Sequence, residues 1–394
     1  MKGIIYIFIF FCFFPYLDLF QLGTDTQPNA LILASLLLFA LPKKKINAPI
    51  VLLGVVFILS LFLFIGSGAS SFYYVKNALN YLAPLIVCFA TYNVLLQEKI
   101  TIPFKYFLAV ILCYAFVGLI QYYLDPFFLT SLVNGSARGI MIGGRGVVSL
   151  CPEPAFYGTM CIFLMVFSLL NYSKKENLLA LSILLFQLFF LSKSLTAVVI
   201  FFLALAIFLV TQIIRFRLKY IMSTVVILLL AMYIGNRMIP DTDTRIGQLT
   251  ESFIQDPLLI TKVDASVGVR FTGAIAPYLS WKYNHLLPMG IGHYKSFLQK
   301  IYRTDEGRQF LTPIIVNEKD TLGGGANMII YQLGFLGLIF PFAIYLAFRE
   351  GIKTSALCKL SFLLFICILF TQIQLMHSMI GFIIAFALNK KNLI

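Results

Sequence analysis

Charged side chains are scarce in this chain, and their scarcity excludes most soluble folds. Only 12% of the 394 residues are charged, whereas 60% are hydrophobic. A soluble domain carries about 25% charged residues on average, so this composition cannot cover the surface of a water-soluble protein. Apolar runs recur along the chain, and most are near the ~20 residues that a helix needs to cross a bilayer. The sequence therefore predicts an all-α, polytopic membrane protein.

Several patterns that would indicate other chemistries are also missing. The seven cysteines form no CxxC pair and the three histidines show no ligand spacing, so neither a disulfide framework nor a metal site is predicted. The sequence contains no GxxxxGK[ST] and no GxSxG, which would indicate a P-loop and a nucleophile elbow. We therefore expect no metal, no cofactor and no use of ATP.

Twelve apolar runs are predicted to span the membrane, and the charges between them give the orientation. Twelve spans put both termini on one side, which holds 16 of the 30 basic residues but only 3 of the 16 acidic residues. Basic residues beside span ends stay in the cytoplasm, so both termini are predicted to be cytoplasmic. The positive net charge then reflects topology, and nucleic-acid binding is not indicated. The predicted spans are 3–20, 29–41, 49–66, 78–96, 104–124, 155–172, 177–192, 195–214, 219–239, 325–348, 357–373 and 375–388.

Two loops on the opposite side are much longer than the cytoplasmic connections. They divide the chain into helices 1–5 within 1–124, a first outer loop at 125–154, helices 6–9 within 155–239, a large and partly helical outer loop at 240–324, and helices 10–12 within 325–394. Long ordered loops in compact proteins commonly carry function. The chemistry is therefore expected at the outer face.

The first outer loop combines arginines among glycines with one carboxylate between prolines. Glycines near Arg138 and Arg145 let a backbone approach a ligand closely, and guanidinium groups suit phosphate oxygens. Glu153 lies between Pro152 and Pro154 at the start of the sixth span. Its carboxylate can act as a general base there, or it can merely interact with the dipole of the helix start.

Further candidates lie in another outer turn, in the large loop and at the tenth span. Lys193 lies in a very short outer turn, either as a site residue or as a side chain that snorkels to the interface. Arg270 begins a stretch typical of an amphipathic or interfacial helix, and Arg245 and His293 belong to the same loop. By spacing alone, a lone arginine on such a helix is usually a surface residue and a lone histidine is usually structural. Asn327 follows a glycine run, which suits an anion at a helix start or close helix packing.

In their order, spacing and sidedness, these residues resemble the outer-loop signature of the O-antigen ligase and Wzy-type O-antigen polymerase superfamily. The segments that carry the resemblance are Arg270, Trp281, Pro288–Phe297, Asn327 and Leu333–Gly337. The similarity covers roughly residues 138–340, and the topology matches over the rest of the chain.

The details are more similar to polymerases than to ligases. The stretch from Arg145 to Gly158, with Glu153 between prolines, resembles the polymerases. Ligases typically carry a histidine beside the asparagine that precedes the tenth span, and this chain has Ala326 at that position. A ligase mechanism that uses this histidine as a base therefore does not carry over.

The resemblance implies a GT-C-like glycosyltransferase of the bacterial inner membrane that needs no metal. Its expected donor is a glycan on undecaprenyl pyrophosphate, and its expected acceptor is another lipid-linked repeat unit. The product would be O-antigen or a related surface polysaccharide. Membrane lipids and a Wzz-type chain-length regulator are the implied partners. A polysaccharide ligase and a lipid-linked oligosaccharide flippase are the alternatives.

Residue roles follow from this reaction. We expect Arg145 and Arg270 to bind the pyrophosphate and Glu153 to deprotonate the acceptor hydroxyl, so that these three residues are catalytic. His293 is the alternative base, and we favour Glu153. The residues expected to contribute to substrate binding are Arg138, Lys193, Arg245, His293 and Asn327.

Overall fold

The described part of the chain is a helical, multi-pass membrane protein. The computed structural model describes residues 1–19, 25–66, 72–133, 146–213, 256, 261, 265–311, 324–371 and 373–390. Within these ranges the structure has no β-sheet, and an isolated bridge pairs Leu17 with Val133. The described helices that are long and apolar enough to cross a membrane are Asn77–Glu98, Phe104–Tyr123, Pro154–Asn171, Lys174–Ser192, Leu195–Gln212 and Gly325–Thr354.

Within the described residues, a helix lies at each predicted span, although several helices are shorter than the span predicted. The first half of the chain forms α1 (Lys2–Phe13), α2 (Asn29–Ala40), α3 (Ala48–Gly66), α4 (Phe72–Glu98), α5 (Phe104–Tyr123), α6 (Pro154–Asn171), α7 (Lys174–Phe186) with its π-helical end η2 (Gln187–Ser192), and α8 (Leu195–Ile213). The second half forms α12 (Ala265–Tyr283), α13 (Tyr294–Ile301), α14 (Asp305–Phe310), α15 (Gly325–Leu333), η3 (Gly334–Leu338), α16 (Ile339–Thr354), α17 (Ala356–Leu369) and α18 (Ser378–Lys390). The predicted ninth span, 219–239, lies outside the described residues.

The first helix is shorter than the predicted span 3–20. Helix α1 ends at Phe13, and Phe14 leaves the helical region with φ −124° and ψ 65°. Pro15 explains this early end, because a proline disfavours the helical conformation of the residue before it. The helical part covers about 18 Å at 1.5 Å per residue, which is less than the ~30 Å hydrocarbon core.

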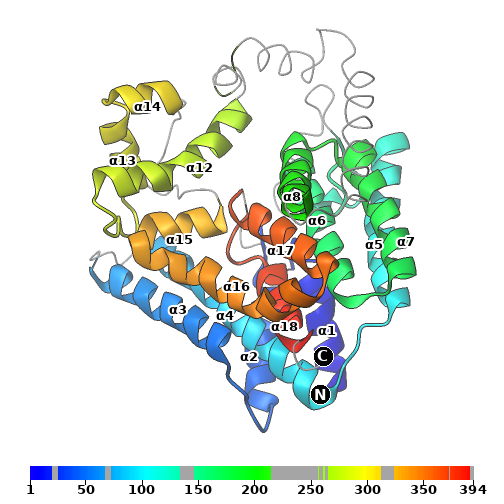
Figure 1. Cartoon of the computed structure of the whole chain (residues 1–394). Helices are drawn as coiled ribbons and strands as arrows, with labels where there is room; N and C mark the ends of the chain where they lie inside the picture. The colour runs from blue at the N-terminus through cyan, green and yellow to red at the C-terminus, as the bar shows by residue number, and fades with distance from the viewer. Residues whose placement is uncertain are drawn as a thin grey trace.

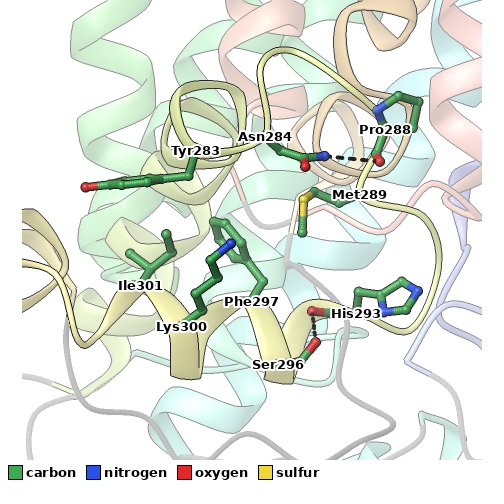
Figure 2. Close-up of a pocket in the computed structure, with 9 residues that line it drawn as sticks. All are labelled: Tyr283, Asn284, Pro288, Met289, His293, Ser296, Phe297, Lys300 and Ile301. Carbon is green, nitrogen blue, oxygen red and sulfur yellow. Dashed lines mark hydrogen bonds between the residues drawn. The ribbon is translucent and has the colours of Figure 1, made fainter.

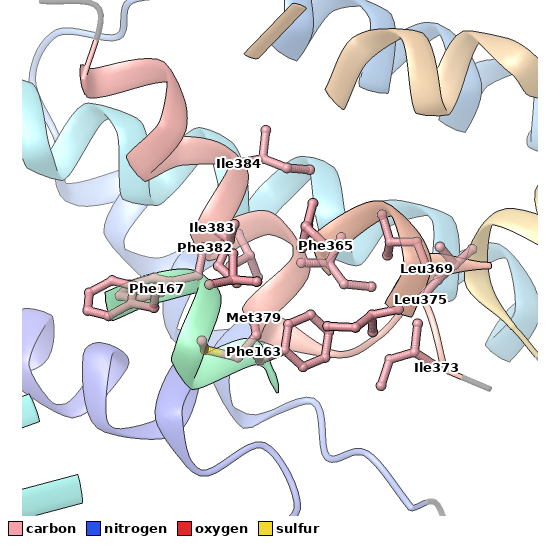
Figure 3. Close-up of a cluster of buried hydrophobic side chains, with 14 of the residues drawn as sticks. Phe163, Phe167, Phe365, Leu369, Ile373, Leu375, Met379, Phe382, Ile383 and Ile384 are labelled. Carbon is pink, nitrogen blue, oxygen red and sulfur yellow. The ribbon is translucent and has the colours of Figure 1, made fainter. Parts of the chain in front are cut away.

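Helix α6 lies in the middle of the helix bundle. All its residues from Phe156 to Leu170 are buried, and it contacts α7, α8, α17 and α18. Figure 3 shows Phe163 and Phe167 of α6 against the side chains of α17 and α18. The Phe167 ring stacks on Phe382 with centroids 5.6 Å apart. Because α6 is buried on all sides, its position is fixed by the helices around it.

The start of α6 lies at the end of the bundle away from the chain termini. Tyr16, which follows α1, packs on Phe156 near the start of α6 with ring centroids 5.7 Å apart. Phe386, near the other terminus, packs on Phe167 in the second half of α6 at 5.0 Å. Figure 1 shows α12, α13 and α14 on the side opposite the two chain ends. We call this side the distal end.

Helices α12, α13 and α14 form a small unit at the distal end. Helix α12 contacts α15 and η3 and buries Thr272, Ala276 and Leu279, which share one face at helical spacing. The predicted helix after Arg270 is therefore present. Glu306 of α14 pairs with Lys282 of α12. This ion pair joins the last helix of the unit to the first.

The pair should make the attachment of α14 depend on pH. The hydrogen bond from Lys282 holds the pKa of Glu306 below its ordinary value. The stabilisation is complete above the ordinary glutamate pKa and is lost as the pH falls through the lowered pKa. We expect hydrogen-exchange protection factors of α14 amides to fall on acidification through this range. The Glu306→Gln variant should have low protection at all pH values. A variant whose protection falls with pH as in the wild type would contradict the role of the pair.

Candidate functional site

Glu153 is presented at the start of α6 in an extended conformation. Its φ is −147° and its ψ is 156°, and Pro154 occupies the first turn of the helix. Both flanking prolines are buried, whereas Glu153 is partly exposed. Its side chain makes no capping hydrogen bond to the helix. The carboxylate is therefore not used as a hydrogen-bonding cap.

A buried hydrogen-bond clamp holds the segment that leads to Glu153. Gln121 of α5 accepts a hydrogen bond from the Ser149 backbone N–H at 2.6 Å and donates one to the Ser149 carbonyl at 3.0 Å. The Ser149 hydroxyl donates to the carbonyl of Tyr114 at 2.7 Å. Ser149 has a φ of +52°, which is uncommon for a residue other than glycine. The clamp fixes this turn four residues before Glu153.

A second buried pair joins the first turn of α6 to the π-helical segment η2. The Tyr157 hydroxyl donates to Gln187 Oε1 at 2.9 Å. The Gln187 amide in turn donates to the carbonyl of Ile111 on α5 at 3.2 Å. Buried polar groups need such partners, because an unpaired one costs about 1–3 kcal/mol. These hydrogen bonds therefore connect α5, α6 and the π-helical end of α7 within one helical turn of Glu153.

The turn after η2 packs directly against the start of α6. A Cβ atom on Gly146 would lie 2.1 Å from the Ser192 carbonyl oxygen, and one on Gly158 would lie 2.7 Å from the Ala197 Cβ. Only glycine permits an approach this close. The turn that carries Lys193 and the segment that carries Glu153 are thus in contact.

Lys193 points its ammonium group at an aromatic ring. Its backbone is left-handed with a φ of +44°. The Nζ atom lies 5.2 Å from the ring centroid of Tyr122, near the end of α5, which is a cation–π distance. Tyr122 is exposed. Lys193 therefore stays at the distal surface, as both alternatives from the sequence require.

Three of the predicted arginines lie outside the described residues, namely Arg138, Arg145 and Arg245. Arg270 is described and lies on α12, partly buried. It is 11 residues from Trp281, so the two share one face of the helix. The expected convergence of Arg145, Glu153 and Arg270 over one pocket stays a prediction.

Asn327 joins two helices at the distal end. Its side-chain amide donates to the carbonyl of Phe370, just after α17, at 2.8 Å. A Cβ atom on Gly324 would lie 1.9 Å from the Thr371 carbonyl oxygen. The chain after α17 therefore fills the space beside the start of α15. For the glycine run before Asn327, the sequence suggested either anion binding or close packing. Close packing explains Gly324.

His293 borders a cavity of about 350 Å³ in the α12–α13 region. Figure 2 shows the side chains around it. They include Tyr283, Asn284, Met289, His293, Phe297 and Lys300. The sequence-based prediction did not include Lys300, which also lines this cavity. The helical spacing of His293, Phe297 and Lys300 is a signal that could have found it, because residues at i, i+4 and i+7 share one face.

The described residues provide no group of three or more His, Cys, Asp and Glu side chains that could hold a metal ion. No protein-family model and no curated protein matches the chain.

The close contact at Gly158 gives a matched test of how the site is positioned. Gly158→Ala should lower the thermal stability of the detergent-solubilised protein, because overpacking costs about 1–3 kcal/mol. Gly54→Ala in α3 is the control, since a Cβ atom there meets nothing within 4 Å. It should be neutral or slightly stabilising, because alanine favours a helix over glycine by about 1 kcal/mol. Equal melting temperatures for the two variants would argue against the tight contact.

The clamp at Gln121 can be tested in the same assay. Gln121→Ala removes both partners of the Ser149 backbone, and each unpaired buried group costs about 1–3 kcal/mol. We expect a clear drop in melting temperature. Gln299→Ala on the exposed face of α13 should change stability by less than about 0.5 kcal/mol. A Gln121→Ala variant as stable as Gln299→Ala would show that the clamp contributes little.

Proposed function

We propose that this protein is a metal-independent glycosyltransferase that joins undecaprenyl-pyrophosphate-linked repeat units into O-antigen or a related surface polysaccharide. The observation that carries the proposal is the rigid presentation of Glu153 at the distal end of an apolar bundle, against the turn that carries Lys193. The charge distribution of the loops supports an inner-membrane protein with cytoplasmic termini. The distal end then faces the periplasm.

The proposed reaction needs a base and cations, and the chain offers both. Glu153 takes the proton of the acceptor hydroxyl, whose oxygen attacks the anomeric carbon of the donor. The bond from that carbon to the pyrophosphate oxygen breaks, and undecaprenyl pyrophosphate leaves with the electron pair. Arg270 and Arg145 neutralise the charge that develops on this leaving group. The donor is already activated, so the step needs no ATP.

The buried clamp supports a catalytic role for Glu153. A base works best when its carboxylate is held within hydrogen-bonding reach of the proton that it removes. The bonds between Gln121 and Ser149 and the contact at Gly158 restrict the backbone around Glu153. A surface carboxylate without a function would not need a backbone held by these contacts, which is why we favour Glu153 as the base.

The polymerase activity is favoured over the ligase activity by the start of α15. Ala326 occupies the position where ligases typically have a histidine, and it is buried inside α15. No imidazole base is available at that point of the chain. We further propose a Wzz-type chain-length regulator as a partner of the polymerase in the membrane.

The role of Glu153 is tested by surface polysaccharide profiles of a deletion strain complemented with variants. Glu153→Gln should remove long chains and leave single repeat units, because loss of a general base costs about 10²–10⁴ in rate. Arg270→Ala should have a similar effect, since one lost charge-stabilising group costs about 10²–10³. Glu176→Gln is the control, because Glu176 is the capping-box residue of α7 and glutamine also fits a capping box. A normal ladder with Glu153→Gln would refute its role as the base.

The same gels distinguish the candidate activities in the deletion strain itself. Loss of a polymerase leaves one repeat unit on the lipid core. Loss of a ligase leaves polymer that is not attached to the core, and loss of a flippase leaves no outer product. Either of the last two profiles would replace the proposed function.

A further inference from the structure

The cavity beside His293 lies in the α12–α14 unit. The floor is apolar: Phe297 is only 4% exposed, and the ring of Tyr331 from α15 packs against it at 5.3 Å. Met289 and Pro288 add further apolar surface. This floor is suited to the apolar face of a ring-shaped ligand rather than to a small inorganic ion.

The unit is fastened to the membrane helices through the segment that borders the cavity. The Gly290 N–H donates to the Gln332 carbonyl at 3.1 Å, and the Phe335 N–H donates to the Leu286 carbonyl at 3.0 Å. Gln332 itself accepts a hydrogen bond from the Tyr81 hydroxyl inside the bundle. A ligand in the cavity is therefore held in a fixed position relative to α15.

Polar groups around the cavity are basic or neutral. Among the residues that line it, Lys300 and His293 are the titratable bases, Asn284 and Ser296 are neutral, and none is acidic. Figure 2 shows the Lys300 side chain running along Phe297 toward the middle of the cavity. Within the described part of the chain, neither the Lys300 ammonium nor the His293 ring has a hydrogen bond or an ion pair.

The carboxylate that contacts the cavity residue Tyr283 also has another partner. Glu306 pairs with Lys282 and accepts a hydrogen bond from the Tyr283 hydroxyl at 3.2 Å. Both of its oxygens are thus engaged by Lys282 and Tyr283. Among the described residues, no carboxylate pairs with Lys300, so its positive charge is open to a ligand.

We infer that this cavity is a subsite for an acidic sugar of the glycan substrate. The inference rests on the proposed function, because that function supplies glycan at the distal end. The C–H face of the sugar packs on Phe297 and Met289, and its carboxylate accepts hydrogen bonds from Lys300 and His293. A neutral sugar would leave the ammonium group without a partner, and a free phosphate would leave the apolar floor uncovered.

Direct binding to the purified full-length protein in detergent tests the inference. Saturation-transfer NMR with methyl glucuronoside, methyl galacturonoside and methyl glucoside measures which ring binds. We expect at least one uronoside to bind more tightly than the glucoside. Lys300→Glu should weaken uronoside binding by about tenfold or more, because a hydrogen bond to a charged group is worth about 1.5–3 kcal/mol.

Arg308→Glu is the matched control. Arg308 is an exposed cation of the same unit that pairs with Asp305, and it does not line the cavity. This variant makes the same change of charge, so uronoside binding should stay at the wild-type level. Equal weakening by both variants would show a general charge effect and would overturn the subsite.

Other outcomes also decide the question. Failure of both uronosides to bind, or binding of the glucoside as tight as theirs, would overturn the inference. Displacement of a bound uronoside by inorganic pyrophosphate at an equal or lower concentration would identify a phosphate site instead. The assay requires no turnover and does not involve Glu153. Loss of uronoside selectivity and loss of polymerase activity are therefore separately observable.

Discussion

The hydrogen bonds between Gln121 and the Ser149 backbone are the constraint on which the distal end depends. They lie in an apolar bundle, where water cannot replace a missing partner, so the turn at Ser149 has to form where Gln121 reaches it. That turn sets where α6 begins and where Glu153 emerges. The buried hydrogen bond from Tyr157 to Gln187 fixes the first turn of α6 against η2 in the same way.

Close backbone packing adds a second constraint to this arrangement. Gly146 and Gly158 let the turn at Lys193 lie directly on the start of α6, and Gly324 lets the chain after α17 lie against α15. In each case a side chain would hold the two segments apart. The apolar helices therefore supply a close-packed support for the polar groups at the distal end.

The proposed base and the proposed sugar subsite belong to different parts of the structure. Glu153 is supported by α5, α6 and η2, whereas the cavity with Lys300 belongs to the α12–α14 unit, which rests on α15 and η3. Such a division suits a transferase that must handle a reactive group and a chain of sugars at once. In the proposed reaction, the membrane helices hold the base and the unit at the distal end binds the glycan.

The sequence by itself determined the membrane class, the approximate positions of the described apolar helices and the start of α6 beside Glu153, because hydropathy, charge and proline act locally along the chain. Its prediction of chemistry at the outer face stays a prediction. The sequence also indicated the helix after Arg270. The early end of α1 at Pro15 was missed, although its cause is local. Only the tertiary structure decided that Gln121 holds Ser149, that Asn327 bonds to Phe370, and that Lys300 lies with His293 beside Phe297. These pairings depend on which helix faces meet, and that is set by the packing of the whole bundle rather than by any short segment.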